Sequence, residues 1–554
     1  MDKQTLHLLQ HTTRYFSEQQ QRPYLVGGSL RNLLLGEECL DWDIVTPGDT
    51  HKTARQLADT LGGHYVYMHE KASRVIVFVE DSDFPNNRKE ICFDISPLIG
   101  KTIEDDLRQR DFTINAIAAP LDEVVRYLEI DVASQSNTEY PHQRATIKAL
   151  PTSTQPPSPL QYDRTLHFID PLNGLVDLQA RRLKAVDDQV FRHDPLRMLR
   201  AVRLMMRYQL QMDPWTASLI TRDAELLPEV AWERVHDELY AILGPEGAAN
   251  RLRFLDEHSL FIIIFPEFVP ARGMRQPNPH HWDVLTHSIE TVGALEHIAQ
   301  LVRGETGHPH RNVGAPLADA RVDGGGINAL ATATNIDLAE ISSLLQEAEW
   351  QGIFSFAGLT APRMKMAALL HDIGKPVTYS CDEEGAIHFY NHPLAGVPLV
   401  EQVMRRLCAS TQDRRLAQLV AAHHMRPGQL GHDGPVTLRA IRRYFVDLGP
   451  AGIYVALFSL ADHLATLGPQ PTADAWKRHL GVVRLLLTSY IRERDSILPP
   501  RLISPEELIR RLKLEPGPIV GQLLDLISEA QAEGKIHSKE EAVWFAEEKV
   551  QEMR

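Results

Sequence analysis

The sequence has little cysteine and no long apolar stretch. Its four cysteines are too few and too widely spaced for a disulfide framework or a cysteine-based zinc site. The longest apolar run, Leu260 to Phe265, is far too short to span a bilayer, and no N-terminal segment resembles a signal peptide. We therefore expect a protein of the reducing cytoplasm that does not enter a membrane.

An excess of positive charge is also absent. The formal net charge is -15 at pH 7, so binding to RNA would require a local basic patch. The composition, with 43% hydrophobic and 24% charged residues, is that of a globular protein, and 554 residues predict several domains. The 25 histidines justify a search for metal ligands.

The first informative stretch is a glycine turn near the N-terminus. Tyr24 to Val26 is a short apolar run that predicts a strand. Gly27 and Gly28 let the backbone approach a ligand closely, and Ser29 is a good N-cap for the helix predicted after it. A helix N-terminus behind a glycine turn is an anion site that suits phosphate.

Two carboxylates follow this turn. In a strand, successive side chains point to opposite faces, so Asp41 and Asp43 share one face and Trp42 lies on the other. Hard divalent cations take oxygen ligands such as paired carboxylates. The anion site and the carboxylates together indicate metal-dependent chemistry on a nucleoside triphosphate. Either feature alone also fits a surface hairpin with two solvated aspartates.

The combination resembles the signature of the tRNA nucleotidyltransferase and poly(A) polymerase family, which includes bacterial CCA-adding enzymes. The family pattern is Gly-Gly-x-x-Arg-Asp followed by Asp-x-Asp. Here residues 27–32 read Gly-Gly-Ser-Leu-Arg-Asn, so Asn32 departs from the family's Asp, and residues 41–43 read Asp-Trp-Asp. The resemblance implies that Asp41 and Asp43 bind Mg²⁺. It also implies a triphosphate site made by Gly27, Gly28, Ser29 and Arg31.

Two further segments extend the resemblance within the head. Glu90 to Ser96 predicts a strand, and Asp94 supplies a third catalytic carboxylate if that strand lies beside Asp41 and Asp43. Otherwise Asp94 is an ordinary polar residue on the outer face. Residues 105–118, DDLRQRDFTINAIA, resemble the family's second motif, with Gln109 in place of its first Arg. The resemblance implies ribose and triphosphate contacts from Arg110, Asp111 and Asn115. Asp111 also fits a helix cap, and both roles can hold together.

Residues 191–207, FRHDPLRMLRAVRLMMR, predict a helix with an apolar stripe and basic faces. They resemble the family's base-selecting motif, Glu-Asp-x-x-Arg, with His193 in place of Glu. The resemblance implies that the incoming CTP or ATP is bound by Asp194, Arg197, Arg200 and Arg203. Eight Lys or Arg against three Asp between residues 181 and 207 form a local basic surface that fits RNA. A solvated charged face is the alternative.

From about residue 280 onward, histidines recur on segments predicted as helical. One histidine on an apolar helix is usually core, but here the order His, His-Asp, His, His, Asp resembles an HD domain. The resemblance implies a divalent transition metal or Mg²⁺ held by His287, His371, Asp372 and Asp462. His392 and His423 are expected to hold a second ion. HD domains generally act as phosphohydrolases, and an HD fold kept as a scaffold is the alternative.

The expected fold is α+β. A nucleotidyltransferase head with a mixed or antiparallel sheet and helices (residues 1–190) precedes an all-α neck (191–270), HD domain (271–470) and C-terminal tail (471–554). Residues 133–166, rich in Ser, Thr, Gln and Pro, and 304–336, rich in Gly, Ala and Asn, are predicted to be insertions. Residues 174–178 are predicted to belong to a hairpin that closes the head.

The function that the resemblance implies is template-independent addition of C, A or both to the 3′ end of tRNA, with CTP and ATP as substrates. The 3′-hydroxyl attacks the α-phosphate and pyrophosphate leaves. Poly(A) addition and CC-only or A-only addition stay open, because the segment between Arg74 and Asp94 is short for a full CCA-adding enzyme. A catalytically weakened RNA-binding HD protein is a third alternative, motivated by Asn32, Gln109 and His193.

Overall fold

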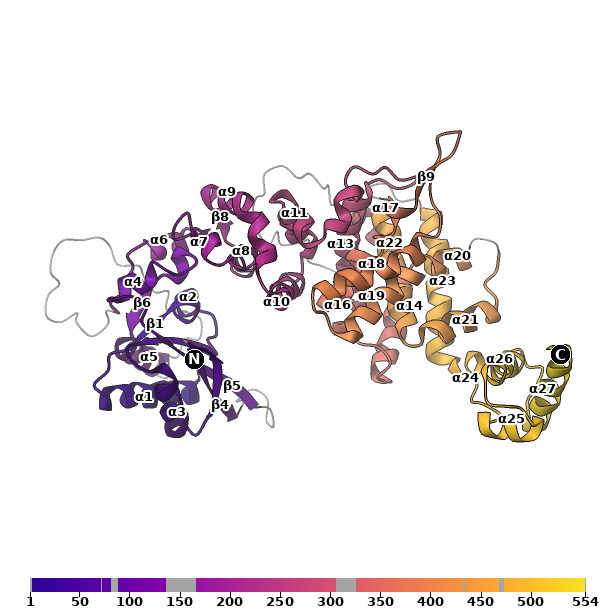
Figure 1. Cartoon of the computed structure of the whole chain (residues 1–554), viewed down its shortest axis with the longest axis horizontal. Helices are drawn as coiled ribbons and strands as arrows, with labels where there is room; N and C mark the ends of the chain where they lie inside the picture. The colour runs from indigo at the N-terminus through magenta and orange to yellow at the C-terminus, as the bar shows by residue number, and fades with distance from the viewer. Residues whose placement is uncertain are drawn as a thin grey trace. The chain divides into compact units, whose positions relative to one another are not determined.

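The computed structural model describes residues 2–70, 72–80, 88–135, 166–304, 325–431, 434–467 and 473–553 (Figure 1). The chain folds into two compact units, Met1–Leu226 and Leu227–Arg554. The first unit contains a six-stranded mixed sheet with helices, and the described residues of the second are helical apart from the hairpin of β9 (Tyr379–Cys381) and β10 (Ile387–Phe389). The expected α+β class is therefore confirmed.

The sheet of the first unit has the strand order β3-β4-β5-β2-β1-β6. Only β2 and β5 run parallel, and the other neighbouring pairs are antiparallel. A small parallel pair, β7 (Arg182–Leu183) and β8 (Gln211–Met212), lies apart from it. The strands of the main sheet are β1 (Tyr24–Val26), β2 (Asp41–Thr46), β3 (His64–His69), β4 (Ala72–Glu80), β5 (Arg88–Pro97) and β6 (Ala118–Pro120).

One face of this sheet is the core of the first unit. Trp42, Phe93 and Val75 from adjacent strands are fully buried there against apolar side chains of α1, α3 and α5. Because side chains alternate along a strand, the residues between them lie on the opposite face. The helices and 3₁₀ turns from the N-terminus to residue 229 are α1 (Lys3–Glu18), α2 (Gly27–Leu35), α3 (Thr50–Leu61), α4 (Ile103–Leu107), η1 (Thr113–Asn115), α5 (Leu121–Gln135), α6 (Gly174–Gln179), α7 (Val190–His193), α8 (Arg197–Arg207), α9 (Pro214–Asp223) and η3 (Ala224–Glu229).

Three local predictions in this unit need correction. The helix after β1 begins at Gly27 rather than after Ser29, so Ser29 lies in its first turn. Residues 174–179 form helix α6 instead of a hairpin, because Asp170 accepts hydrogen bonds from the N–H groups of Gly174 and Leu175.

The predicted helix 191–207 is two helices, α7 and α8. Asp194 between them is extended, with φ -151° and ψ 100°. Pro195 follows it, and proline disfavours helical backbone in the residue before it.

The helices of the second unit pack on one another. Helix α13 packs on α22, α16 and α14, and α18 packs on α19. Helices α25 to α27 share a separate small apolar core that includes Leu508, Leu523 and Ala546. The helices are α10 (Trp232–Leu243), α11 (Ala248–Glu257), α12 (Leu260–Ile264), η4 (Pro266–Ala271), α13 (Val284–Arg303), α14 (Gly325–Trp350), α15 (Phe356–Leu359), α16 (Pro362–Leu370), α17 (Lys375–Thr378), α18 (His392–Arg406), α19 (Thr411–His423), α20 (Arg426–Leu430), α21 (Leu438–Leu448), α22 (Ala451–Leu467), α23 (Ala473–Arg492), α24 (Arg494–Ile497), α25 (Pro505–Leu512), α26 (Pro518–Ala532) and α27 (Lys539–Met553).

The two predicted insertions are only partly covered by the structure. Residues 136–165 of the first lie outside the described residues. The second was expected to be a loop over 304–336, but α14 begins at Gly325, so its last part is helical. Within the described ranges no single helix is long and apolar enough to cross a bilayer. Leu438–Leu448 and Ala451–Thr466 reach that length and composition only as a pair, across a bend of 107°.

We expect the buried face of the sheet to dominate the stability of the first unit. Replacing Phe93, which is fully buried on β5, by Ala should lower the free energy of unfolding of this unit by about 3–5 kcal/mol. The measurement is hydrogen exchange of peptides from β2 and β5 in increasing urea. Phe78→Ala is the matched control, because Phe78 lies on the neighbouring strand and is exposed. Equal losses of protection in both variants would contradict this account of the core.

Candidate active site and metal cluster

The open face of the sheet carries the three predicted catalytic carboxylates. In the parallel pair of β2 and β5, Asp43 lies directly opposite Asp94, and Asp41 lies opposite Cys92. The condition for Asp94 to join the other two carboxylates is therefore met. Asp41 is exposed, with 65% of its side chain accessible, and Asp43 is half-buried. Burial, together with the nearby charges of Asp94 and Asp41, raises the pKa of Asp43.

The first turn of α2 is tied to Asp43. The Ser29 N–H donates to Asp43 Oδ2 at 3.2 Å, and the Asp43 N–H donates to Ser29 Oγ at 3.0 Å. The N-terminus of α2 thus lies beside the carboxylates, with the Ser29 N–H donating to Asp43 and the Gly27 N–H donating to the Ile117 carbonyl at 3.4 Å. The predicted anion site and the paired carboxylates therefore lie side by side.

Glycine is required at the first residue of this helix. Gly27 has φ +65°, and a Cβ there would lie 2.8 Å from Arg110 Nη1. A Cβ on Gly28 would lie 3.3 Å from Asp43 Oδ2. The missing side chains therefore bring backbone, guanidinium and carboxylate together at one place, as predicted for a phosphate-binding turn.

Arg31 is buried rather than exposed to an incoming triphosphate. Its Nη1 donates to Asn115 Oδ1 at 2.5 Å, and its Nη2 donates to the Tyr208 hydroxyl at 2.7 Å. The guanidinium carbon also lies 4.2 Å from the centre of the Tyr208 ring. Asn32, which departs from the family pattern, accepts hydrogen bonds from both Arg31 and Tyr208. Arg31 therefore holds Asn115, Asn32 and Tyr208 in place.

Asp111 and Asn115 belong to the same buried network. The Asn115 amide donates to Asp111 Oδ1 at 2.9 Å, and Arg200 forms an ion pair with Asp111 at 3.2 Å. Burial alone would raise the pKa of Asp111. The charge of Arg200 and the hydrogen bond from Asn115 lower this pKa below its ordinary value. Asp111 also accepts from the Phe112 N–H, but η1 begins at Thr113 with Phe112 as its N-cap and no side-chain cap, so the expected role of Asp111 as a helix cap is wrong.

The other residues predicted to bind the nucleotide are Arg110, before Asp111 in the chain, and Asp194, Arg197 and Arg203, in or next to α8. Arg110 pairs with Asp106 at 3.0 Å. Arg197, the first residue of α8, donates to the backbone carbonyls of Gln109 and Arg110. Asp194 accepts from the Leu196 N–H at the break before α8. Arg203 lies farther along α8, three residues after Arg200.

Arg74 is a site residue that the sequence reading missed. It lies opposite Asp94 on β4 and binds both of its carboxylate oxygens, at 2.7 and 2.8 Å. Its Nη2 also lies 3.8 Å from Asp41 Oδ1. Residues 74–80, which lie in β4, contain no sequence signal for this contact, because only the register of β4 on β5 places Arg74 there.

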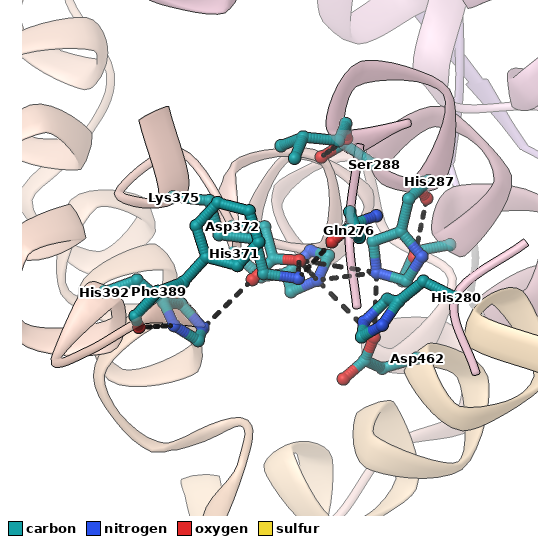
Figure 2. Close-up of polar contacts among 12 residues, drawn as sticks. Gln276, His280, His287, Ser288, His371, Asp372, Lys375, Phe389, His392 and Asp462 are labelled. Carbon is teal, nitrogen blue, oxygen red and sulfur yellow. Dashed lines mark hydrogen bonds and ion pairs between the residues drawn. The ribbon is translucent and has the colours of Figure 1, made fainter. Parts of the chain in front are cut away.

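The second cluster lies inside the second unit, among α13, α16, α18, α19 and α22 (Figure 2). In the described part of the chain, the groups of His and Asp whose candidate ligand atoms lie within 4.8 Å of one another all come from this cluster. The head carboxylates do not form such a group. The cluster residues are His287, His371, Asp372, His392, His424 and Asp462.

Three of these histidines present the same ring nitrogen to the cluster. The Nδ1 atoms of His371, His392 and His424 lie 2.8, 2.8 and 2.9 Å from the backbone carbonyls of Ala368, Phe389 and Ala421. Such a contact assigns the proton to Nδ1 and leaves Nε2 as the ligand atom. The His287 and His371 Nε2 atoms are 3.3 Å apart.

Asp372 is at the centre of the cluster. Its two oxygens are buried and accept no hydrogen bond of acceptable geometry, although Lys375 Nζ lies 2.5 Å and His392 Nε2 3.3 Å from them. Burial would raise its pKa, but His371 and Lys375 hold the pKa of Asp372 well below its usual range. A buried carboxylate surrounded by imidazole Nε2 atoms fits a divalent metal ion.

The structure corrects one predicted ligand. His424, not His423, joins His392 and Asp372 in the cluster. Neighbouring side chains on a helix point about 100° apart, so only one of two consecutive histidines can face a given site. His423 is half-buried near Arg426 instead. The helical phase of the apolar residues Leu416, Val420 and Ala421 was the available signal.

Three family models match the sequence. The poly A polymerase head domain matches residues 23–129, a model described as "Probable RNA and SrmB- binding site of polymerase A" matches 209–271, and the HD domain matches 338–467. The head model thus covers the open sheet face, and the HD model covers all the cluster residues except His287.

Similar proteins cover nearly the whole chain. An A-adding tRNA nucleotidyltransferase of Deinococcus radiodurans is 28% identical over 94% of this chain and 94% of its own length. A CC-adding tRNA nucleotidyltransferase of Synechocystis is 25% identical over 95% of this chain and 92% of its own. A solved CCA-adding enzyme in complex with ATP has the same fold, with a TM-score of 0.57, 18% identity and coverage of 100% of this chain and 97% of that chain.

We expect substitution of His424, but not of His423, to lower the metal content of the protein. His424→Ala removes an imidazole that faces Asp372 and should weaken metal binding at least about tenfold. His423→Ala is the matched control and should leave metal binding unchanged. Elemental analysis of the purified full chain, after titration with Mn²⁺ or Zn²⁺, measures both. Equal metal content in the wild type and His424→Ala would refute the ligand assignment.

Proposed function

This chain belongs to the tRNA nucleotidyltransferase and poly(A) polymerase family, and we propose that it adds C, A or both to the 3′ end of tRNA from CTP and ATP. The observation that carries the proposal is the position of Asp41 and Asp43 on the open sheet face, beside the N-terminus of α2. That arrangement offers oxygen ligands to a divalent cation and N–H groups to a triphosphate.

Mg²⁺ is the metal proposed for the head. Asp41 and Asp43 fit it, because a cation would offset the mutual repulsion that contributes to the raised pKa of Asp43. When bound, Mg²⁺ would lower the pKa of the attacking hydroxyl and neutralise charge on the leaving oxygens. Asp94 is proposed as a third ligand, because each of its oxygens accepts one hydrogen bond from Arg74 and keeps a second lone pair.

The protein's own groups position the nucleotide. Gly27, Gly28 and Ser29 are proposed to hold the phosphates, with the Gly27 and Ser29 N–H groups exchanging their present acceptors, Ile117 O and Asp43, for phosphate oxygens. Arg110 adds a guanidinium beside Gly27. Arg31 holds Asn115 in place, and Asn115 holds Asp111. No covalent nucleophile is needed, since positioning and charge account for phosphoryl transfer.

Base selection is proposed for the start of α8. Asp194 and Arg197 are the candidates for hydrogen bonds to the Watson–Crick edge of the incoming base, with Arg200 and Arg203 nearby on the same helix. The basic stretch from Arg181 to Arg207 is proposed to contact tRNA phosphates. Arg192 and Arg200 in this stretch are already paired with Asp223 and Asp111, so part of the positive charge is neutralised within the unit.

The relatives include both an A-adding and a CC-adding enzyme, so full CCA addition and both partial activities remain proposals. Incubation of trimmed tRNA with CTP alone, ATP alone and both distinguishes them by product length on a denaturing gel. A long tail with ATP alone would instead indicate a poly(A) polymerase. A location in a reducing cytoplasm is also a proposal, supported by the four cysteines, all of which are free.

We expect the catalytic carboxylates to be essential for incorporation of labelled CTP or ATP into trimmed tRNA. Asp43→Asn keeps the shape of the side chain and removes its charge, so it should lower kcat by at least about a hundredfold. Asp49→Asn is the control, because Asp49 caps α3 away from the carboxylates.

Absence of incorporation by the wild type, with an active family member as positive control, would overturn the proposed transferase. The weakened RNA-binding protein would then remain, and CTP or ATP binding that does not depend on Mg²⁺ would support it.

A second activity is proposed for the histidine cluster, because Asp372 and the Nε2 atoms converge on one buried position that fits a metal ion. His287, His371, Asp372 and Asp462 would hold one divalent ion, and His392 with His424 would hold a second. A bound metal would make a water molecule nucleophilic at neutral pH. Phosphomonoester or 2′,3′-cyclic phosphate ends of RNA are the proposed substrates, and a purely structural HD fold is the alternative.

We expect the His371→Ala/Asp372→Ala variant to lose metal and hydrolysis together while CTP or ATP incorporation survives. Hydrolysis of a 2′,3′-cyclic phosphate end and of a 3′-phosphate end is measured with Mn²⁺, Ni²⁺ and Mg²⁺. Asp43→Asn is the reciprocal control and should hydrolyse normally. Stoichiometric metal without hydrolysis in the wild type would leave a structural metal site only.

A further inference from the structure

An apolar stripe continues from the catalytic carboxylates across the open face of the sheet. Facing residues in an antiparallel pair lie on the same side, so Arg74 shares the face of its partners Asp94 and Val66. Alternation along β4 adds Ile76 and Phe78 to this face. The edge strand β3 adds His64, which lies opposite Ile76.

The stripe is open to solvent and ends in an aromatic pair. Phe78 is 48% exposed and Val66 is 38% exposed. The rings of His64 and Phe78 meet edge to face, with centroids 6.0 Å apart. Apolar side chains on a half-covered sheet are normally placed on the buried side, and here the opposite side already holds the core. An exposed aromatic beside a reaction centre suits a ligand with a flat ring.

The arrangement of the active site gives the direction from which the acceptor approaches. The helix N-terminus proposed to hold the phosphates follows β1, on one side of β2. Phosphoryl transfer places the attacking and leaving oxygens roughly in line. The attacking 3′-hydroxyl therefore arrives from the other side of β2, where β5, β4 and β3 lie in succession about 4.8 Å apart.

We propose that this stripe receives the single-stranded 3′ end of the RNA acceptor, with a base stacked on Phe78 and His64 and a backbone phosphate near Arg74. The inference rests on the proposed transferase function. Stacking on aromatic rings is the general means by which proteins hold unpaired bases, and it does not depend on base identity. Arg74 is held by Asp94 but is still 30% exposed, so it can meet a phosphate without leaving its partner. Glu90 lies opposite Phe78 and two residues before Cys92, the residue opposite Asp41, so an uncharged base rather than a phosphate is placed at this position.

Steady-state kinetics with trimmed tRNA test the stripe. Phe78→Ala should raise KM for tRNA by between about fivefold and a hundredfold, the range expected for one lost base stack. KM for the nucleotide should stay the same. Phe78→Trp should restore the wild-type value, and Phe78→Leu, which keeps an apolar side chain without a ring, should not.

Tyr67→Ala is the matched control. Tyr67 is an exposed aromatic residue on β3, but it lies opposite the buried Ser73 and stacks on His51 of α3, so it belongs to the other face. Its replacement should not change KM for tRNA. An equal effect of Tyr67→Ala and Phe78→Ala, or a KM within twofold of the wild type in Phe78→Ala, would overturn the proposal.

A binding experiment separates this inference from the transferase proposal. The probe is an RNA acceptor-stem hairpin whose 3′ overhang ends in 2-aminopurine, whose fluorescence is quenched by stacking. We expect quenching with the wild type and Tyr67→Ala and its loss with Phe78→Ala, even if no nucleotide is incorporated. If Phe78→Ala instead dissociates a dimer in sedimentation and leaves quenching intact, the stripe binds a second copy of the chain and the proposal is wrong.

Discussion

The pairing of β2 with β5 is the constraint on which the first unit depends. Its register places Asp43 opposite Asp94 and, at the same time, Trp42 opposite Phe93. A shift by one residue would turn the carboxylates into the core and the aromatic side chains into solvent. The apolar face therefore stabilises the fold and also aligns the catalytic face, because the same alternation determines both.

Buried polar contacts then support the site from the helices behind it. Arg31 connects α2 to Asn115 of η1 and to Tyr208, the residue that follows α8. Asp111 connects η1 to Arg200 of α8. These contacts connect α2, which carries the proposed phosphate site, to α8, which is proposed to select the base. A displacement of α8 within this unit would therefore also move α2. Buried, charge-assisted networks of this kind are rigid because an unpaired member would be costly.

The two candidate metal sites differ in how far their carboxylates are buried and in which cations lie beside them. In the first unit the carboxylates are partly exposed, and Arg74 binds Asp94 and approaches Asp41, so a protein cation already offsets part of their repulsion. In the second unit Asp372 is fully buried, and Lys375 and the imidazoles surround it. Desolvation strengthens interactions in the second site and solvent screens them in the first. The buried cluster is therefore preformed, whereas the open one can rearrange when its substrates bind.

The sequence alone determined the glycine turn and the paired aspartates, because each depends on short-range spacing or strand alternation. Its resemblance to a known family implied the α+β class and the order of the HD ligands. Tertiary structure decided the rest. It buried Arg31 instead of exposing it and brought Arg74 to Asp94. The choice of His424 over His423 and the helix break at Asp194 had local signals, namely the helical phase of the neighbouring apolar residues and Pro195. The contacts of Arg31 and Arg74 depend on burial and strand register between residues far apart in the chain, so no local pattern contains them.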